Sequence, residues 1–368
     1  MKFICNQQVL AKALNIVLKA VTPRTTIPIL KGLLLTVDSN GNLKMVASDM
    51  DLSIEKNLQV QLPEEGSIVV SAKLFNDIIR KLPNEDVEVT EENNTVTIRC
   101  LASEFTIVGQ SAEEFPSIGS VNSEERIKLD KSVIKDMIKK TSFSASIEES
   151  KGIIVGILVE MEDDYLSMVA LDGFRMALAK EKKSYNENRK IVISAKIMNE
   201  IYKIFMETDE DENVEMILDD KKAVFLLEDT RIVSRIMEGE FIKYKGIIPK
   251  EYSSKLIVDR LELLDSIERA SLLAREGRNN LVKLSLEEGG LVITSSSEEG
   301  NVIEKINTHK EGNDLVIGFN AKYIIDALKV INDEEIVMEF GSNVNPCLIK
   351  PISGDEYLYL ILPVRIAA

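Results

Sequence analysis

Few residues of this chain have the types and spacing that carry out acid-base, nucleophilic or metal chemistry. The single histidine, His309, lies in a polar stretch with no cysteine or acidic partner at ligand spacing. The cysteines Cys5, Cys100 and Cys347 are far apart and have strand-like neighbours, so we expect reduced residues of the core or of a sheet. The sequence contains no phosphate-binding, dinucleotide-binding or nucleophile-elbow motif. It therefore predicts no catalytic residue, no metal ion and no cofactor.

One arginine stands where a simple hairpin does not need it. The stretch VALDGFRMALAKEK, residues 169–182, alternates as a strand does, breaks at a polar turn and resumes with Arg175 between Phe174 and Met176. A turn between two strands explains Asp172 and Gly173. Such a turn does not explain a cation between two large apolar side chains, so we expect Arg175 to have a function beyond the turn.

Length and composition restrict the class of protein. At 368 residues the chain is too long for one ordinary core, which favours two or three domains. Neither a signal-peptide pattern nor a run of 18 apolar residues occurs, so we expect a cytoplasmic protein without a membrane partner. The net charge of −16, taken alone, argues against binding to nucleic acid, because such binding depends on the neutralisation of phosphates.

The chain contains a threefold repeat. Each of three stretches combines a short β-branched strand, an Ala-Lys pair and an amphipathic helix: IVVSAKLFNDIIRKL (68–82), IVISAKIMNEIYKIF (191–205) and LVIGFNAKYIIDALKVI (315–331). A second series with the same period occupies residues 2–21, 126–144 and 255–273. Strand–helix elements thus recur six times along the sequence, two in each repeat.

Strands follow each of these helices, so the repeating unit is β-α-β-β-β. Six copies, paired into three domains of about 120 residues, predict an α+β fold with helices on one face of antiparallel sheets. The apolar periodicity lapses at residues 120–126 and 249–255. We therefore expect domains that span residues 1–123, 124–250 and 251–368.

The predicted helices are the basic part of an acidic chain. Their net charge is +8, which leaves −24 for the rest of a chain whose total is −16. Lysine and arginine are good helix formers on solvated faces, and this explains any single helix. Glutamate forms helices equally well, however, and most of it lies elsewhere. The asymmetry favours helices that face a polyanion.

These features and several local motifs resemble the bacterial sliding clamp family, the β subunit of DNA polymerase III. The resemblance covers the whole chain, from MKFICNQQVL and VTPRTTIPILKGLLL onward. ALDGFRMAL resembles the family's Thr-Asp-Gly-x-Arg-Leu segment, and SRIMEGEFIKYKGIIP resembles its Ser-Arg-Leu-x-x-Gly-x-Phe-Pro-x-Tyr segment. IGFNAKYIIDAL and LPVRIAA resemble its Gly-Phe-Asn-x-x-Tyr helix start and its Met-Pro-x-Arg end.

The resemblance implies a head-to-tail ring of two chains around double-stranded DNA, with helices inside and sheets outside. Such a ring is a processivity factor without catalytic activity of its own. The implied partners are the DNA polymerase III catalytic subunit, the clamp loader, and other polymerases and repair proteins that carry short clamp-binding motifs. The DNA-binding positions carried over from the family are Arg24, Lys73, Arg80, Lys151 and Lys196.

The resemblance also implies how the ring closes. The strand EFTIVG of the first domain would meet the helix SLLAREG of the third, with Phe105 and Ile107 packed on Leu272 and Leu273 of the other chain. The alternative is that these four side chains fill the cores of their own domains.

In this family the segment around Arg175 lines a shallow pocket for a partner peptide, between the second and third domains. One wall would comprise Leu171, Gly173, Phe174, Arg175 and Met176, with Ile154 nearby and with a floor of Ile242 and Ile247. The third domain would add Asn320, Tyr323, Val344, Leu360, Leu362, Pro363, Val364 and Arg365. Arg175 and Arg365 would offer guanidinium donors to peptide carbonyls. Leu171, Phe174 and Ile242 depart from the family pattern and would make the pocket more apolar.

Two other interpretations remain open from the sequence. A protein-interaction scaffold with the same repeat would use the pocket but would not encircle DNA, and the charge asymmetry of the helices weighs against it. An enzyme with an unrecognised site among the 61 carboxylates is the second, and no residue singles out such a site.

Overall fold

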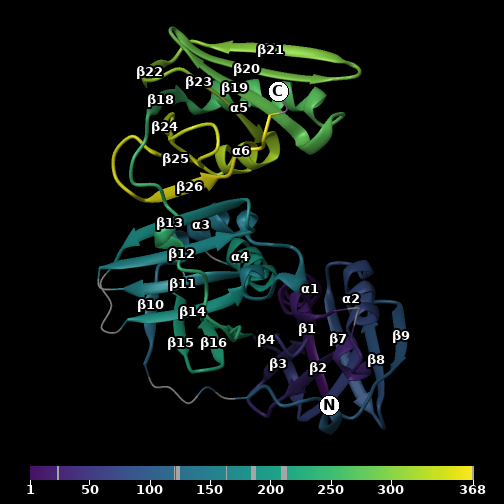
Figure 1. Ribbon diagram of the computed structural model, residues 1–368. Helices are drawn as coiled ribbons and strands as arrows, with labels where there is room; N and C mark the ends of the chain where they lie inside the picture. Colours follow the sequence, from purple (N-terminus) through teal and green to yellow (C-terminus); the bar gives the residue numbers. More distant parts are fainter. Residues whose placement is uncertain are drawn as a thin grey trace. The chain divides into compact units, whose positions relative to one another are not determined.

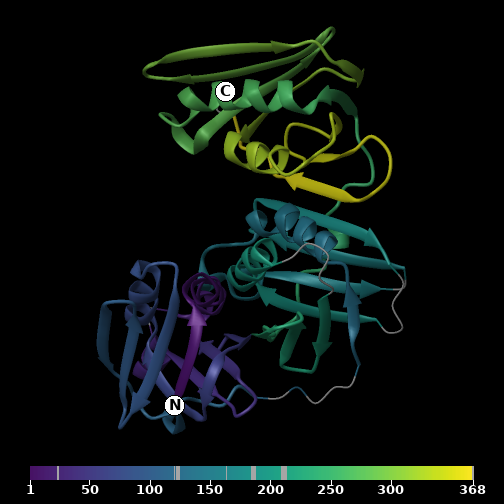
Figure 2. The same cartoon turned by 180° about the vertical axis from the view of Figure 1, so that it is seen from behind.

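The computed structural model describes residues 1–22, 25–119, 121, 125–162, 164–183, 188–208 and 214–366 (Figures 1 and 2). The chain divides into two compact units. Unit 1 comprises Met1–Ser132 and Glu200–Ile236, and unit 2 comprises Val133–Asn199 and Met237–Ala368. Each unit takes part of the middle third of the chain. The division into three domains therefore stays a prediction.

The described elements repeat the β-α-β-β-β order six times, as the sequence predicts (Figure 1). The first copy comprises β1 (Lys2–Asn6), α1 (Gln7–Val17), β2 (Gly32–Val37), β3 (Asn42–Ser48) and β4 (Leu52–Gln59). The second comprises β6 (Gly66–Ser71), α2 (Ala72–Lys81), β7 (Asp86–Glu92), β8 (Thr95–Cys100) and β9 (Ser103–Val108). The third comprises β10 (Ile127–Leu129), α3 (Lys131–Thr141), β11 (Gly156–Glu162), β12 (Tyr165–Leu171) and β13 (Arg175–Lys182).

The fourth copy comprises β14 (Arg189–Ser194), α4 (Ala195–Glu207), β15 (Val214–Leu218), β16 (Lys222–Leu226) and β17 (Thr230–Arg235). The fifth comprises β18 (Ser254–Asp259), α5 (Arg260–Ala274), β19 (Leu281–Glu287), β20 (Gly290–Ser297) and β21 (Gly300–Ile306). The sixth comprises β23 (Leu315–Asn320), α6 (Ala321–Leu328), β24 (Glu335–Phe340), β25 (Cys347–Pro351) and β26 (Tyr357–Ile361). Two further strands, β5 (Gln61–Glu64) and β22 (His309–Gly312), lie at sheet edges.

Helices begin where the sequence places a capping side chain before an apolar periodic stretch. Asn6 Oδ1 accepts a hydrogen bond from the backbone N–H of Gln8 at 3.0 Å and starts α1. Asp259 Oδ1 accepts one from the backbone N–H of Glu262 at 2.7 Å and starts α5. These caps satisfy amide groups that the first helical turn leaves without a partner.

The strands of one repeating unit are divided between two sheets. In unit 1, β1 joins the sheet β5-β1-β7-β8-β9, whereas the strands that follow α1 join β6 in the sheet β10-β15-β16-β17-β4-β3-β2-β6. Neighbouring copies therefore exchange their first strands, and one copy cannot complete a sheet alone. This exchange explains why the copies occur in pairs.

Two of the sheets each consist of two parts joined edge to edge, four and four strands in unit 1 and four and five strands in unit 2. In unit 1, β17 pairs with β4, and Ile232 lies opposite Ile54. In unit 2, β13 pairs with β26 within the sheet β14-β11-β12-β13-β26-β25-β24-β18-β22, and Met176 lies opposite Leu360. Every strand at these two junctions is the third strand after a helix. The other two such strands, β9 and β21, lie at sheet edges and have no further partner strand within the described chain.

The helices close the apolar side of the sheets. In unit 2, Leu263 and Ile267 of α5 and Leu328 of α6 are fully buried in one cluster with Leu284 of β19 and Ile293 of β20. Throughout the part of the chain that the structure describes, no helix has the length and apolar character needed to cross a membrane.

Candidate functional site

The candidate site starts at the hairpin turn between β12 and β13. Asp172 Oδ1 accepts hydrogen bonds from the backbone N–H groups of Phe174 at 2.8 Å and of Arg175 at 3.1 Å. Gly173 has a φ of +94°, which suits glycine at the first central position of a two-residue hairpin turn. The Asp-Gly pair thus fixes the backbone that carries the next two side chains.

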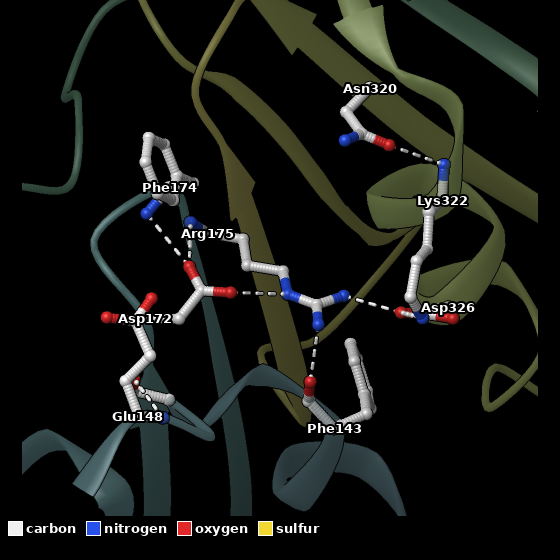
Figure 3. A network of polar contacts seen from close by, with 9 residues as sticks. Phe143, Glu148, Asp172, Phe174, Arg175, Asn320, Lys322 and Asp326 are labelled. Atoms are coloured by element: carbon white, nitrogen blue, oxygen red, sulfur yellow. Dashed lines mark hydrogen bonds and ion pairs between the residues drawn. The ribbon is translucent and has the colours of Figure 1, made fainter. Parts of the chain in front are cut away.

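The side chain of Arg175 points into unit 2, where three groups accept its hydrogen bonds (Figure 3). Nε donates to Asp172 Oδ2 at 3.0 Å, Nη1 donates to Asp326 Oδ2 at 2.6 Å, and Nη2 donates to the carbonyl of Phe143 at 2.6 Å. The guanidinium carbon lies 5.4 Å from the ring centre of Phe143 and 4.6 Å from that of Tyr323. Arg175 therefore ties the turn to α6 and to the chain that follows α3.

This geometry gives Arg175 a role within the chain, and its contact with a partner peptide stays a prediction. Asp172 and Asp326 form ion pairs with its guanidinium at hydrogen-bond distance, and its side chain is only 9 % exposed. The exposed neighbour is Phe174, whose ring lies 6.4 Å from that of Tyr323 in a stacked arrangement. The hydrogen bonds of the Arg175 side chain fix the turn and thereby position its neighbour Phe174 at the surface.

A second cation shares the carboxylate of Asp326. Lys322 Nζ donates to the same Oδ2 atom at 2.8 Å, from one turn earlier in α6 (Figure 3). Asn320 caps this helix and accepts a hydrogen bond from the backbone N–H of Lys322 at 3.0 Å. Sequence reasoning assigned no role to Asp326 or Lys322, although Lys322 occupies the repeated Ala-Lys position.

Three of the predicted wall residues belong to the interior. Leu171, Met176 and Leu360 are at most 3 % exposed and form one apolar cluster with Leu158 and Phe241. They support the surface and do not present side chains to solvent. The predicted apolar residues that are most exposed to solvent are Phe174, Ile242, Ile247, Val344 and Leu362.

The predicted floor residues lie at the surface of the chain. Ile242 and Ile247 are 44 % and 46 % exposed, whereas Phe241 and Tyr244 of the same segment are buried. The segment directs its aromatic residues inward, so the two isoleucines lie at the surface.

On the other side of the turn, the Leu362 N–H donates to the carbonyl of Phe174 at 2.8 Å. Of the other predicted residues, Gly173 and Arg365 are exposed, and those that are partly buried are Ile154, Asn320, Tyr323, Pro363 and Val364.

A buried carboxylate anchors the segment that carries Ile242 and Ile247. Tyr244 Oη donates to Glu160 Oε2 at 2.6 Å, and Lys190 Nζ donates to Glu160 Oε1 at 2.8 Å. Burial, and then the hydrogen bond to Glu160, raise the pKa of the Tyr244 phenol, which therefore remains a donor. Sequence reasoning missed Glu160; its place in the apolar run GILVEME was the available signal.

The four residues of the implied seal lie on strand β9 and helix α5 and differ in their exposure in the single chain. Ile107 is 8 % exposed in the single chain and lies opposite the buried Val96, so it is buried without a second chain. Phe105 is 40 % exposed and Leu272 is 64 % exposed, whereas Leu273 is partly buried. Phe105 and Leu272 are thus the predicted seal residues that are most accessible to another chain.

The predicted DNA-binding cations are exposed where the structure describes them. Three of them lie on α2 and α4: Lys73, Arg80 and Lys196. Lys151 pairs with Glu148 at 3.8 Å, and its Nζ lies 5.9 Å from the ring centre of Phe174. Lys151 therefore borders the exposed phenylalanine of the candidate site. Arg24 lies outside the described residues.

The described residues offer little chemistry of their own. They contain no group of three His, Cys, Asp or Glu side chains arranged to hold a metal ion. All three cysteines are buried. Burial and the nearby Asp86 raise the pKa of the Cys5 thiol to about 11, and burial also raises the pKa of the Cys100 and Cys347 thiols. Such thiols are poor nucleophiles at neutral pH.

Comparison with protein families matches almost the whole chain. The DNA polymerase III beta subunit matches in three parts: its N-terminal domain with residues 1–119, its central domain with 128–243 and its C-terminal domain with 245–365. The chain belongs to the DNA polymerase III beta subunit family.

Relatives of this chain are named beta sliding clamps. That of Halalkalibacterium halodurans is 34 % identical over 99 % of this chain and 100 % of its own. That of Staphylococcus aureus is 33 % identical over 99 % of both chains. The solved structure of the DNA polymerase sliding clamp from Bacillus subtilis has a TM-score of 0.96 at 35 % identity and covers 100 % of both chains. A putative DNA polymerase III beta subunit from Eubacterium rectale has a TM-score of 0.95 at 36 % identity, with the same coverage.

These similarities identify the repeated clamp fold and the class of protein. A beta sliding clamp is a DNA replication accessory protein, a processivity factor rather than a catalytic subunit. The interpretation as a scaffold that does not bind DNA is not favoured.

Proposed function

We propose that this sliding clamp works as a closed head-to-tail ring of two copies that encircles duplex DNA. The pattern of strand edges carries the proposal. Each of the two edge-to-edge junctions joins the third strands of two repeating units. Within the described chain, β9 and β21 are the third strands that remain unjoined. If β9 of one copy pairs with β21 of the other, the same arrangement is completed at two equivalent seams.

The side chains at these edges support the pairing. Phe105 and Val108 on β9 are 40 % and 83 % exposed, and Ile303 on β21 is 61 % exposed. Leu272 of α5 is exposed in the same unit as β21. Exposed apolar strand edges invite aggregation unless another strand covers them. A contact between unlike surfaces that closes after two copies avoids an open filament. We take residues 1–123, 124–250 and 251–368 as the three domains of each copy.

The charge distribution supports loose enclosure of DNA. The six helical stretches carry +8 in a chain of −16, and the exposed cations on helices include Lys73, Arg80 and Lys196. Weak contacts with phosphates are independent of base sequence and fall steeply with salt. A ring holds the duplex by topology, so such contacts can centre the DNA and still permit sliding in the cytoplasm.

The exposed apolar side chains around the 172–175 turn support docking of partners. We name Phe174, Ile242, Ile247, Val344 and Leu362 the partner-peptide surface. Two large apolar anchors of a peptide would contribute roughly 3–6 kcal/mol, from which the ordering of the peptide subtracts. Micromolar affinity suits exchange of the DNA polymerase III catalytic subunit, the clamp loader, and other polymerases and repair proteins on one ring.

Molar mass in solution tests the ring. Light scattering should give twice 41.2 kDa. Replacing Leu272 by aspartate should give monomers, because a charge at an apolar seam is costly. The matched control is Leu261→Asp, since Leu261 is 55 % exposed on the same helix and should leave the dimer intact. A monomeric wild-type protein at micromolar concentration would overturn the proposal.

A further inference from the structure

We propose that Asp326 couples the partner-peptide surface to the enclosed DNA, because Arg175 and Lys322 compete for one of its carboxylate oxygens. The inference rests on the proposed function, since it requires both a peptide at Phe174 and a duplex beside the helices. It assigns Lys322 as a further phosphate-binding residue and Asp326 as a positioning residue.

The shared oxygen is the structural basis. Asp326 Oδ2 lies 2.6 Å from Arg175 Nη1 and 2.8 Å from Lys322 Nζ. The Asp326 side chain is 19 % exposed and that of Lys322 is 62 % exposed, so an ion from solvent can reach the lysine more easily than the carboxylate. Two cations on one oxygen divide its charge. The loss of one strengthens the interaction with the other.

The threefold repeat indicates which ligand would draw Lys322 away from Asp326. Lys322 follows an alanine at the start of α6, as Lys73 does in α2 and Lys196 does in α4. In each helix an acidic residue follows four positions later, and in α6 this residue is Asp326. Asp326 also accepts an arginine from the turn after β12. In the third repeat, Asp326 thus links Arg175 to a lysine at one of the positions that we propose to face DNA.

The direction of the coupling follows from these contacts. A DNA phosphate that binds Lys322 withdraws it from Asp326, and the full charge of Oδ2 then acts on Arg175. Arg175 holds the turn more firmly against α6, and the turn carries Phe174 beside Tyr323. A better ordered Phe174 costs a peptide less to bind. DNA should therefore raise peptide affinity, and peptide should raise DNA affinity by the same factor.

The experiment measures peptide affinity with and without DNA. The probe is a fluorescent hexapeptide with a glutamine, a leucine and a C-terminal phenylalanine, titrated with the dimer at low salt, with or without saturating short blunt duplex. For the wild type we expect roughly threefold tighter peptide binding with duplex, the range that a partly exposed ion pair can supply. Lys322→Gln should bind the peptide equally with and without duplex.

The matched control is Lys73→Gln, which removes the equivalent lysine of the first repeat. This variant should need more duplex for saturation but should keep the threefold effect. Asp326→Asn should weaken peptide binding and remove the effect of duplex on it. The affinity of this variant for duplex should rise, because Lys322 is released from the ion pair. If wild type binds both probes but shows no effect of duplex, or if Lys322→Gln retains the effect, the coupling is refuted. If wild type binds neither probe, the proposed function itself fails.

Discussion

Tyr244 donates its phenolic hydrogen to Glu160 Oε2 at 2.6 Å and thereby joins the 241–248 segment to β11. Glu160 is only 4 % exposed, and a buried carboxylate needs such partners to remain stable. Ile242 and Ile247 of the partner-peptide surface flank Tyr244 in sequence. One buried hydrogen bond therefore positions two exposed side chains of this surface.

Replacing Tyr244 by phenylalanine should lower the free energy of unfolding by about 1.5–3 kcal/mol, the range for hydrogen bonds to charged groups. It should also weaken peptide binding, because the segment with Ile242 and Ile247 loses its anchor. Urea unfolding and calorimetry with the hexapeptide measure the two effects. Tyr252→Phe, at a tyrosine that is 49 % exposed, is the control. Equal stability of both variants would contradict the anchoring role.

Buried tyrosines should make the protein sensitive to high pH. Burial is the main cause that raises the pKa of the Tyr244, Tyr357 and Tyr359 phenols in the folded protein. The unfolded value is about 10, so the stabilising contribution is complete below about pH 10 and is lost as the pH rises through the folded values. Phenolate absorbance of the native protein should therefore rise in two steps, and the later one should coincide with unfolding. A single step near pH 10 in the native protein would show that these phenols are solvated.

Arg175 should matter for stability much more than Lys180, a cation on the same strand whose side chain is 30 % exposed. Arg175→Ala leaves Asp172 and Asp326 without their shared partner, and we expect a loss of about 2–4 kcal/mol in unfolding free energy. Lys180→Ala breaks a solvent-accessible pair with Asp355, whose side chain is 57 % exposed, and should cost less than about 1 kcal/mol. Similar losses in chemical denaturation would argue against an interior role for Arg175.

Phe174 should be the main apolar contact for a peptide. Phe174→Ala removes a ring that is 54 % exposed, and we expect about tenfold weaker binding of the hexapeptide with an unchanged dimer mass. Tyr252→Ala removes an exposed aromatic residue outside the predicted site and should leave the peptide affinity at the wild-type value. An unchanged affinity in Phe174→Ala would exclude the turn from the binding surface.

The sequence was sufficient for the repeating unit and for the family. Strand–helix periodicity and the spacing of Ala72, Ala195 and Ala321 predicted six β-α-β-β-β units, and the structure and comparisons confirm the repeated fold. The exchange of first strands between copies could not be predicted, because hydrophobic alternation identifies a strand but not its partner. The edge positions of β9 and β21 follow from that exchange.

The site was less accessible to sequence reasoning for related reasons. Arg175 turns inward because Asp326, 151 residues away, accepts its hydrogen bond, and the sequence pattern does not report this proximity. Ile107 and Phe105 share one face of β9, and only the packed structure distinguishes the buried residue from the exposed one. Ile242 lies at the surface because its neighbours Phe241 and Tyr244 fill the interior.

Retention on DNA of different topology tests the central claim most directly. Dimer loaded on a nicked circular duplex should remain bound at moderate salt and should be lost once the circle is cut, because a ring slides off a free end without breaking any contact. Leu272→Asp should not be retained on either form, whereas Leu261→Asp should behave as the wild type. Equal retention of the wild type on circular and linear duplex would contradict encirclement and would indicate direct binding.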